Sequence, residues 1–238
     1  MSLLLYCICE TASHAAPPSP PGVKGKPVRL IPHEGLCAVV SPLPAPVWPL
    51  AWDIPSLLAF ENVVELFHRE QAVLPARYGT VLAGETQVRQ LLDRGREAYV
   101  SALTSLNECV EMGIRIMRES AQEQDPPTAS PASTGAAYLR WRSRCYAERD
   151  ADSHGDLRLL DEVRRAFEGL FVRCQAKSTL AANPLLRAPI LSLEFLVRCD
   201  CENAFRKRFR ALSGTRREKL LLSGPWPPYS FVPTSPGR

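Results

Sequence analysis

Residues 224–232 read GPWPPYSFV and follow an apolar run, Leu220 to Leu222. Three prolines within four positions stop a helix or an inner strand, because proline fixes φ and lacks a backbone donor. Trp226, Tyr229 and Phe231 add large apolar surfaces that can dock the segment. The pattern predicts a strand that ends here and continues into an anchored tail.

Two interpretations of this tail are open. In the first, it is a clasp that closes the second half of the chain, with Trp226 and Tyr229 as buried pegs. In the second, it exposes a proline-aromatic surface that another protein recognises. We favour the clasp, and a mixed role is also compatible with the sequence.

A second unusual string, VLPARYGTV, covers residues 73–81. The residue before Pro75 is disfavoured in a helix, so we expect extended backbone with a break at the proline. Arg77 and Tyr78 fit two roles. Together they can hold a partner's carboxylate and cover apolar surface. Alternatively, Tyr78 packs inside and Arg77 braces the corner at Gly79 through carbonyl groups, which the proline and glycine favour.

With both strings the chain resembles the gas vesicle protein F/L family, whose members carry Leu-Pro-x-Arg-Phe-Gly-Thr in the first half and end on Gly-Pro-Trp-Pro-Pro-Tyr-Ser-Phe. Further landmarks follow in the family's order: Ala38 to Ser41, Val110 to Gly113, Gly135 to Leu139, and Phe195 to Val197. Departures are Tyr78 in place of Phe, Met112 where an aromatic is common, and a proline-rich insertion from Pro17 to Pro32.

The resemblance implies a non-enzymatic accessory or minor structural protein of gas vesicle assembly. It implies binding to the hydrophobic shell protein and to other minor vesicle proteins during nucleation or growth, in the cytoplasm and at the gas vesicle. The alternative is a small-ligand or regulatory module built on ferredoxin-like sheets. Neither interpretation involves nucleic acid or a membrane.

Composition is that of a globular protein, with 45% hydrophobic and 23% charged residues in 238. No run reaches the roughly 20 apolar residues that cross a bilayer, and the apolar start lacks a basic leader and a cleavage site, so we expect no membrane anchor. We expect an α+β protein of two domains: residues 1–121 with a proline-rich loop at 11–32, a linker at 122–134, and residues 135–238.

The first domain is expected to run β-β-α-β-α-β. Strands are predicted over residues 3–9, 36–40 and 109–117, with extended backbone over 73–81. Asp53 or Ser56 can cap the first helix, and Glu85 or Thr86 begins the second. Their apolar stripes are Phe60, Val63, Val64 and Phe67, and Val88, Leu91, Leu92, Tyr99, Leu103 and Leu106. Trp48 and Trp52 are expected to dock the connection between them.

The second domain is expected to be ferredoxin-like with extra helices in front. One helical segment covers about 136–145, and another carries Leu160, Val163, Phe167, Leu170, Phe171 and Cys174 on its apolar side. Strand material at 185–197 precedes a helix with Cys201, Phe205, Phe209 and Leu212, and residues 219–222 form the last strand.

Catalytic, cofactor and metal sites are not expected. The chain has no nucleotide-binding glycine loop and no nucleophile or zinc-protease motif. Cys7/Cys9 and Cys199/Cys201 are two residues apart, unlike most zinc ligands. Residues at this spacing share one face within a strand, and free cysteines are expected to be small buried apolar side chains. An ion pair between Glu111 and Arg77 near the sheet is expected to be structural.

Positive charge gathers near the end of the chain. Residues 198–219 hold eight basic side chains against Asp200, Glu202 and Glu218. No nucleic-acid motif accompanies them, and Phe205 and Phe209 lie four residues apart as a buried helical stripe would. A solvated surface, or one that faces an acidic partner, is therefore favoured over nucleic-acid binding.

Overall fold

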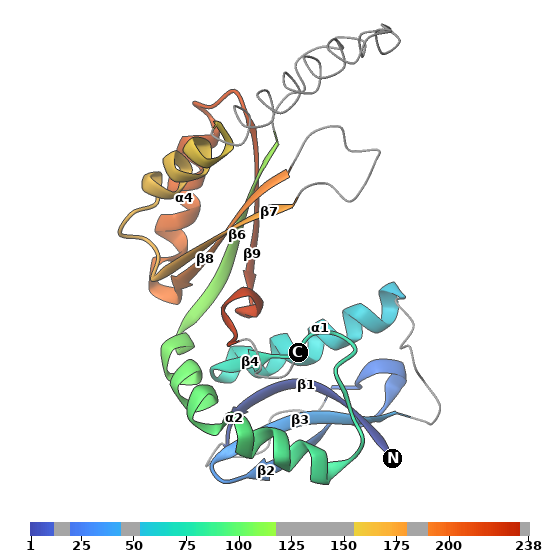
Figure 1. The fold of residues 1–238 in the computed structure, drawn as a ribbon. Coiled ribbons are helices and arrows are strands. Elements are labelled where there is room, and N and C mark those ends of the chain that lie inside the picture. The colour runs from blue at the N-terminus through green and yellow to red at the C-terminus, as the bar shows by residue number, and fades with distance from the viewer. Residues whose placement is uncertain (12–19, 44–52, 118–154, 180–189, 234–238) are drawn as a thin grey trace, which may run out of the picture. The chain divides into compact units, whose positions relative to one another are not determined.

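The computed structural model describes residues 1–11, 20–43, 53–117, 155–179 and 190–233 (Figure 1). The chain divides into two compact units. Unit 1 comprises residues 1–111, 196–199 and 224–238, and unit 2 comprises residues 112–195 and 200–223. Each unit combines a sheet with helices, which confirms the α+β class. The expected linker at 122–134 lies outside the described residues, so the expected domain boundary stays a prediction.

Unit 1 is built on an antiparallel sheet whose central strand is β1 (Ser2–Glu10). The order is β2-β3-β1-β4, and β5 also pairs with β1. The remaining strands are β2 (Arg29–His33), β3 (Leu36–Leu43), β4 (Val73–Pro75) and β5 (Val81–Leu82). The strands predicted at 3–9 and 36–40 are confirmed, and the predicted break at Pro75 separates β4 from β5.

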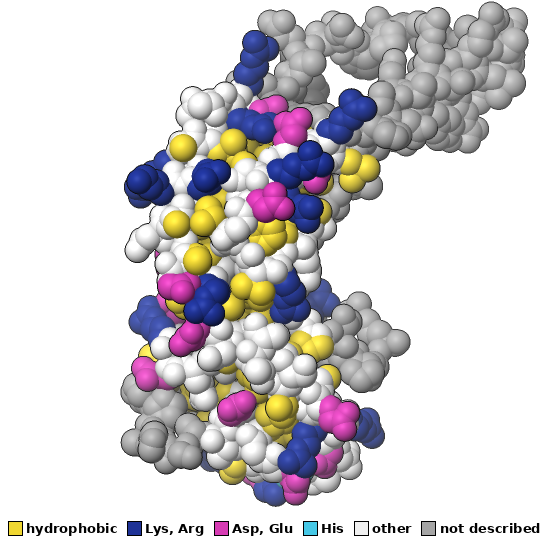
Figure 2. Space-filling model, turned by 90° about the vertical axis from the view of Figure 1, so that its left-hand side faces the viewer, with side chains coloured by type: hydrophobic (Ala, Val, Ile, Leu, Met, Phe, Trp, Pro, Cys, Tyr) yellow, Lys and Arg dark blue, Asp and Glu magenta, His cyan; other side chains and the backbone are white. Residues whose placement is uncertain are grey.

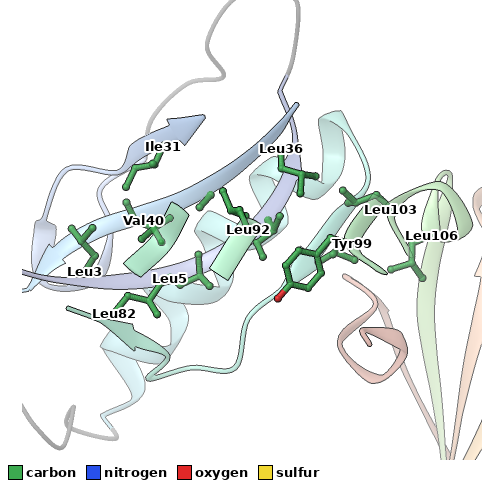
Figure 3. Close-up of a cluster of buried hydrophobic side chains, with 14 of the residues drawn as sticks. Leu3, Leu5, Ile31, Leu36, Val40, Leu82, Leu92, Tyr99, Leu103 and Leu106 are labelled. Atoms are coloured by element: carbon green, nitrogen blue, oxygen red, sulfur yellow. The ribbon is translucent and has the colours of Figure 1, made fainter. Parts of the chain in front are cut away.

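The two faces of this sheet explain why β1 is apolar along nearly its whole length. One apolar cluster contains Leu3 and Leu5 together with α2 (Glu85–Leu106), as Figure 3 shows. The other contains Leu4 and Tyr6 together with α1 (Ile54–Glu70). A strand covered on both faces needs apolar residues at successive positions instead of an alternating pattern.

Tyr6 marks an irregularity in that alternation. The pairing of β1 with β3 shifts between Leu5 and Cys7, so Tyr6 has no opposite residue. A bulge of this kind places two consecutive side chains on one face. Tyr6, Cys7 and Cys9 therefore all lie in the cluster with α1, where the two cysteines serve as small apolar side chains.

Both helices of unit 1 bury the stripes that their spacing predicts. The Asp53 carboxylate caps α1 by accepting from the backbone N of Ser56 at 2.8 Å. Phe60, Val63, Val64 and Phe67 are buried on α1, and Val88, Leu92, Tyr99, Leu103 and Leu106 on α2. Leu91 is partly buried against the same cluster.

The prediction of a proline-rich loop over residues 11–32 is wrong for the second half of that segment. Val23 is fully buried, and residues 29–33 form the edge strand β2. Proline is tolerated in an edge strand, so Pro32 can pair with Cys37. Glu34 and Gly35, with φ of 50° and 84°, make the turn into β3. The sequence signal was this Glu-Gly turn, which the proline count obscured.

Unit 2 contains most of a second sheet of order β7-β8-β6-β9. Its strands are β6 (Cys109–Met117), β7 (Arg173–Thr179), β8 (Ile190–Arg198) and β9 (Lys219–Trp226). Residues 155–166 are helical, and α4 covers Glu202–Ser213. The described elements follow in the chain as β-α-β-β-α-β, and this order is ferredoxin-like as predicted.

Two details differ from the prediction. The strand at 109–117 exists, but it pairs in the second sheet and does not complete the first. The apolar stripe expected to reach Cys174 on one helix is interrupted, because the helix ends at residue 166 and Cys174 lies in β7. Gly169, with φ of 81°, provides the left-handed backbone at this turn. Trp48, Trp52 and the helix expected at 136–145 lie outside the described residues.

We predict that Tyr6→Phe lowers the free energy of unfolding by about 1–3 kcal/mol. The Tyr6 hydroxyl contacts Ser41 Oγ at 2.8 Å and accepts from the Val23 backbone N at 2.9 Å, so both groups would lose a buried partner. Urea unfolding measures the change. Tyr99→Phe on α2 is the control, since no described residue bonds its hydroxyl; an equal loss in both variants would contradict this account.

Candidate functional site

The C-terminal tail is held by two acidic side chains of unit 1. The Tyr229 hydroxyl donates to Glu61 Oε2 on α1 at 2.9 Å. The backbone N and Oγ of Ser230 donate to the two oxygens of Glu111 on β6, each at 2.7 Å. Phe231, 4% exposed, joins the cluster beneath α2. The tail is thus anchored by both hydrogen bonds and apolar burial.

These contacts show that the tail docks on unit 1, which corrects the prediction that it closes the second domain. The tail was expected to close the second domain, but its described hydrogen bonds and apolar contacts lie within unit 1. The partners are 168 and 119 residues away in the chain. A buried carboxylate requires donors, and Glu111 is only 7% exposed. A glutamate inside the apolar run CVEMGIRIM was the signal that sequence reasoning underused.

Burial also changes the pKa values of the two groups in the hydrogen bond between Tyr229 and Glu61. Burial raises the pKa of Glu61, while the hydrogen bond from Tyr229 lowers it. Burial, followed by the negative charge of Glu61, raises the pKa of the Tyr229 hydroxyl. The tyrosine therefore remains a protonated donor, and its hydrogen bond favours the ionised form of Glu61.

Trp226 is not the buried peg that the sequence predicted. Its side chain is 50% exposed, whereas Tyr229 packs partly buried on the cluster with α1. Trp226 is the last residue of β9 and is exposed, whereas burial begins with the next two residues, Pro227 and Pro228. The tail thus combines docked residues with one half-exposed aromatic ring, and its recognition by another protein stays a prediction.

Pro225 and Pro227, on either side of Trp226, line a depression of about 470 Å³. Its other walls are the end of α1, the turn before β6, and Cys199; the residues are Glu65, His68, Arg69, Glu70, Gln71, Ala72, Asn107, Glu108, Cys109 and Val110. Burial lowers the pKa of His68, and its Nδ1 has no hydrogen-bond partner among the described residues. The depression combines largely apolar walls with charged side chains, a combination suited to a protein side chain.

The corner between β4 and β5 contains the other predicted residues. The Tyr78 ring packs edge-on against Phe60, with centroids 5.4 Å apart. Thr80 closes the corner by donating from N and Oγ1 to the Arg77 carbonyl at 3.0 and 2.8 Å. Arg77's side chain is exposed and forms no hydrogen bond with a described residue, so it does not brace the loop as expected.

The expected pair of Arg77 with Glu111 is not found among the described residues, and both oxygens of Glu111 accept from Ser230. Tyr78 and Tyr229 pack against the same cluster around α1. No contact within the described ranges joins Arg77 to Trp226. The structure therefore brings the two tyrosines to one helix and leaves Arg77 and Trp226 as separate exposed side chains.

Metal ligands are not grouped in the part of the chain that is described: no three His, Cys, Asp or Glu residues are placed to hold an ion. Cys7, Cys9, Cys37 and Cys109 are buried. Burial raises the pKa of the Cys7 thiol, and that of Cys174 to about 11. The thiols of Cys7 and Cys174 are therefore poor nucleophiles at neutral pH, because the thiolate is the reactive form.

A family model described as gas vesicle synthesis protein GvpL/GvpF matches residues 2–233. The chain belongs to this family. It is 29% identical to gas vesicle protein L of Streptomyces sp. strain CB03234, covering 96% of this chain and 91% of that protein. It is 27% identical to gas vesicle protein F of the same strain, covering 98% and 100%.

Two crystal structures share the fold of this GvpL/GvpF family member. GvpF from Anabaena sp. PCC7120 aligns with a TM-score of 0.74 at 16% identity, covering 100% of this chain and 98% of that one. GvpF from Microcystis aeruginosa gives the same score and identity, covering 98% and 99%. Family membership supports a role in gas vesicle assembly, and the names of these relatives describe no enzyme. None of the described helices combines the length and apolar character of a membrane span.

We predict that Phe231→Ala costs about 3–5 kcal/mol of unfolding free energy, because it empties a buried site. Trp226→Ala should cost under about 1 kcal/mol, because the ring is half in solvent. Chemical denaturation of both variants measures the difference. A Trp226→Ala protein as unstable as Phe231→Ala would restore the buried-peg interpretation.

We further predict that Tyr229→Phe is more destabilising at pH 7 than at pH 4. Since burial raises the pKa of Glu61 above its unfolded value, the cost of its charge is present at neutral pH and disappears as Glu61 takes up a proton. Loss of the tyrosine donor increases that cost by about 1–3 kcal/mol only while Glu61 is ionised. Unfolding at both pH values tests this. Glu61→Gln combined with Tyr229→Phe should abolish the pH difference between variant and parent; persistence would contradict the assignment.

Proposed function

We propose that this protein is a non-enzymatic assembly component of gas vesicles that binds the hydrophobic shell protein and other minor vesicle proteins during nucleation or growth. It acts in the cytoplasm and at the growing vesicle. The observation that carries the proposal is the family match over residues 2–233, which includes both characteristic strings. The described fold adds a rigidly anchored tail that presents an exposed ring.

Trp226 is the proposed contact for a vesicle protein. Tryptophan is enriched at the energetic centres of interfaces, where it is surrounded by residues that exclude water. Here the ring projects from a backbone fixed on one side by β9 and on the other by Tyr229 and Ser230. Little conformational entropy remains to be lost when a partner covers it, which favours binding.

Arg77 is the second proposed contact. Its guanidinium is exposed at a corner held by two hydrogen bonds from Thr80 and by the packing of Tyr78. An exposed guanidinium on rigid backbone can form a bidentate pair with a partner's carboxylate. In this proposal Tyr78, Tyr229 and Phe231 position these two contacts and do not touch the partner themselves.

We predict that the wild-type chain retains the shell protein when the two are co-expressed and isolated without detergent. Trp226→Ala should lower the retained amount at least about fivefold, which corresponds to about 1 kcal/mol, with an unchanged melting temperature. Quantification of the shell protein in the pull-down measures this. The control is Val100→Ala on α2, another exposed apolar side chain.

The outcomes distinguish two claims of the proposal, that the chain binds the shell protein and that the tail is the contact. Failure of the folded wild-type chain to retain the shell protein would overturn shell binding. Normal retention by Trp226→Ala would overturn the tail as the contact while leaving shell binding intact. A small molecule that copurifies with the wild-type chain, in place of the shell protein, would favour the ligand-binding alternative.

A further inference from the structure

Helix α4 presents a basic face whose orientation is fixed by its apolar side. Phe205 is fully buried and lies 4.3 Å from the ring of Phe167 and 5.2 Å from that of Phe195, measured between centroids. Because the helix cannot rotate without exposing Phe205, the orientation of its exposed positions is fixed. These are Asn203, Ala204, Lys207, Arg208, Arg210 and Ala211, of which Arg208 donates to the Ala166 carbonyl at 2.9 Å.

Several acidic side chains of this region are in ion pairs, and Glu218, between Arg217 and Lys219, is in none with a described residue. Glu202 pairs with Arg206 at 2.7 Å, and Glu162 with Arg216 at 3.1 Å. Asp161 pairs with both Arg164 and Arg165. Among the described residues no ion pair involves four other cations of this region, which are Lys207, Arg210, Arg217 and Lys219. The side of the molecule on which α4 lies carries many Lys and Arg side chains (Figure 2).

Interaction with the helix dipole explains only one of these four cations. Arg210 lies in the last turn of α4, where a cation interacts favourably with the helix dipole. Lys207 is a full turn earlier, and Lys219 follows in β9. None of these cations is in an ion pair within the described residues, so their charge is available to an external anion.

We propose that the exposed basic face of α4, with Lys207 and Arg210, binds an acidic segment of a partner protein. The charge of the face favours an anionic partner over an apolar one. Ala204 and Ala211 have small side chains next to the cations, so a partner helix or extended chain can approach α4 closely. This inference rests on unit 2 alone and does not depend on the proposed shell binding.

Two other anionic partners fit less well. Single-stranded nucleic acid is bound by cationic grooves with exposed aromatic rings for stacking, but Phe205 is buried and Phe209 half-buried. A lipid surface is bound by helices that combine cations with large exposed apolar side chains. The exposed positions of α4 carry alanine as their only apolar residue. An acidic protein segment requires neither feature.

The test uses the full chain and a labelled peptide of about 20 residues, half of them glutamate, with fluorescence anisotropy at low and at physiological salt. The same peptide with glutamine in place of glutamate controls for charge. We expect the chain to bind the glutamate peptide and not the glutamine peptide. Lys207→Glu with Arg210→Glu should weaken it at least about tenfold, since two attractions become repulsions.

The matched control is Arg29→Glu with Arg94→Glu, an equal change of net charge in unit 1 at two exposed positions. It should change affinity less than about twofold at physiological salt, where distant charges are screened. Should the reversed variant lose its circular dichroism spectrum, the neutral Lys207→Gln and Arg210→Gln variant replaces it, with a smaller loss expected.

Three results would overturn the proposal. The first is equal loss in the control variant, which would indicate unspecific attraction. The second is tighter binding of an oligothymidine or of phosphatidylserine vesicles than of the glutamate peptide, which would assign the face to nucleic acid or lipid. The third is no binding of the peptide by the folded wild-type chain at low salt.

Discussion

The buried carboxylate of Glu111 is the constraint on which the arrangement of unit 1 depends. A carboxylate that is 7% exposed must be hydrogen-bonded, and Ser230 satisfies it with both its backbone N and its hydroxyl. Since Ser230 lies in a single turn between Tyr229 and Phe231, this bond also brings one ring to α1 and the other to the cluster beneath α2. The end of the chain thereby becomes part of the N-terminal unit.

The same constraint explains why Trp226 is exposed. Trp226 ends β9, and burial begins with Pro227 and Pro228 ahead of the anchored turn, so the tryptophan remains outside that turn. In the proposed function, stability and recognition are thus assigned to different residues of one short string. In the corner at Arg77 the division is similar: Tyr78 packs on Phe60 while the guanidinium faces solvent.

Unit 2 follows a different principle. Its core is a group of phenylalanines, Phe167, Phe195 and Phe205, which fixes α4 against the sheet. Its charges are divided between ion pairs that involve Glu162 and Glu202 and cations that have no described acidic partner. Packing therefore determines the direction of the charged face, and charge determines what that face can bind.

The sequence by itself determined the family, the α+β class, the helical stripes of α1 and α2, and the strands β1 and β3. These features are local, because periodicity, capping residues and proline positions act within a few residues. It also indicated that the tail is anchored and that Tyr78 packs at a corner. It missed β7, whose residues RCQAKST lack the apolar pattern of a strand.

Only the tertiary structure decided where the tail docks, that Trp226 is exposed, that β6 pairs in the second sheet, and which cations lack ion pairs. Each of these depends on contacts between residues far apart in the chain, such as Tyr229 with Glu61 and Ser230 with Glu111. A glutamate within an apolar run indicates that its carboxylate needs a hydrogen-bond donor. The sequence alone does not say which of the many available donors the fold brings to it.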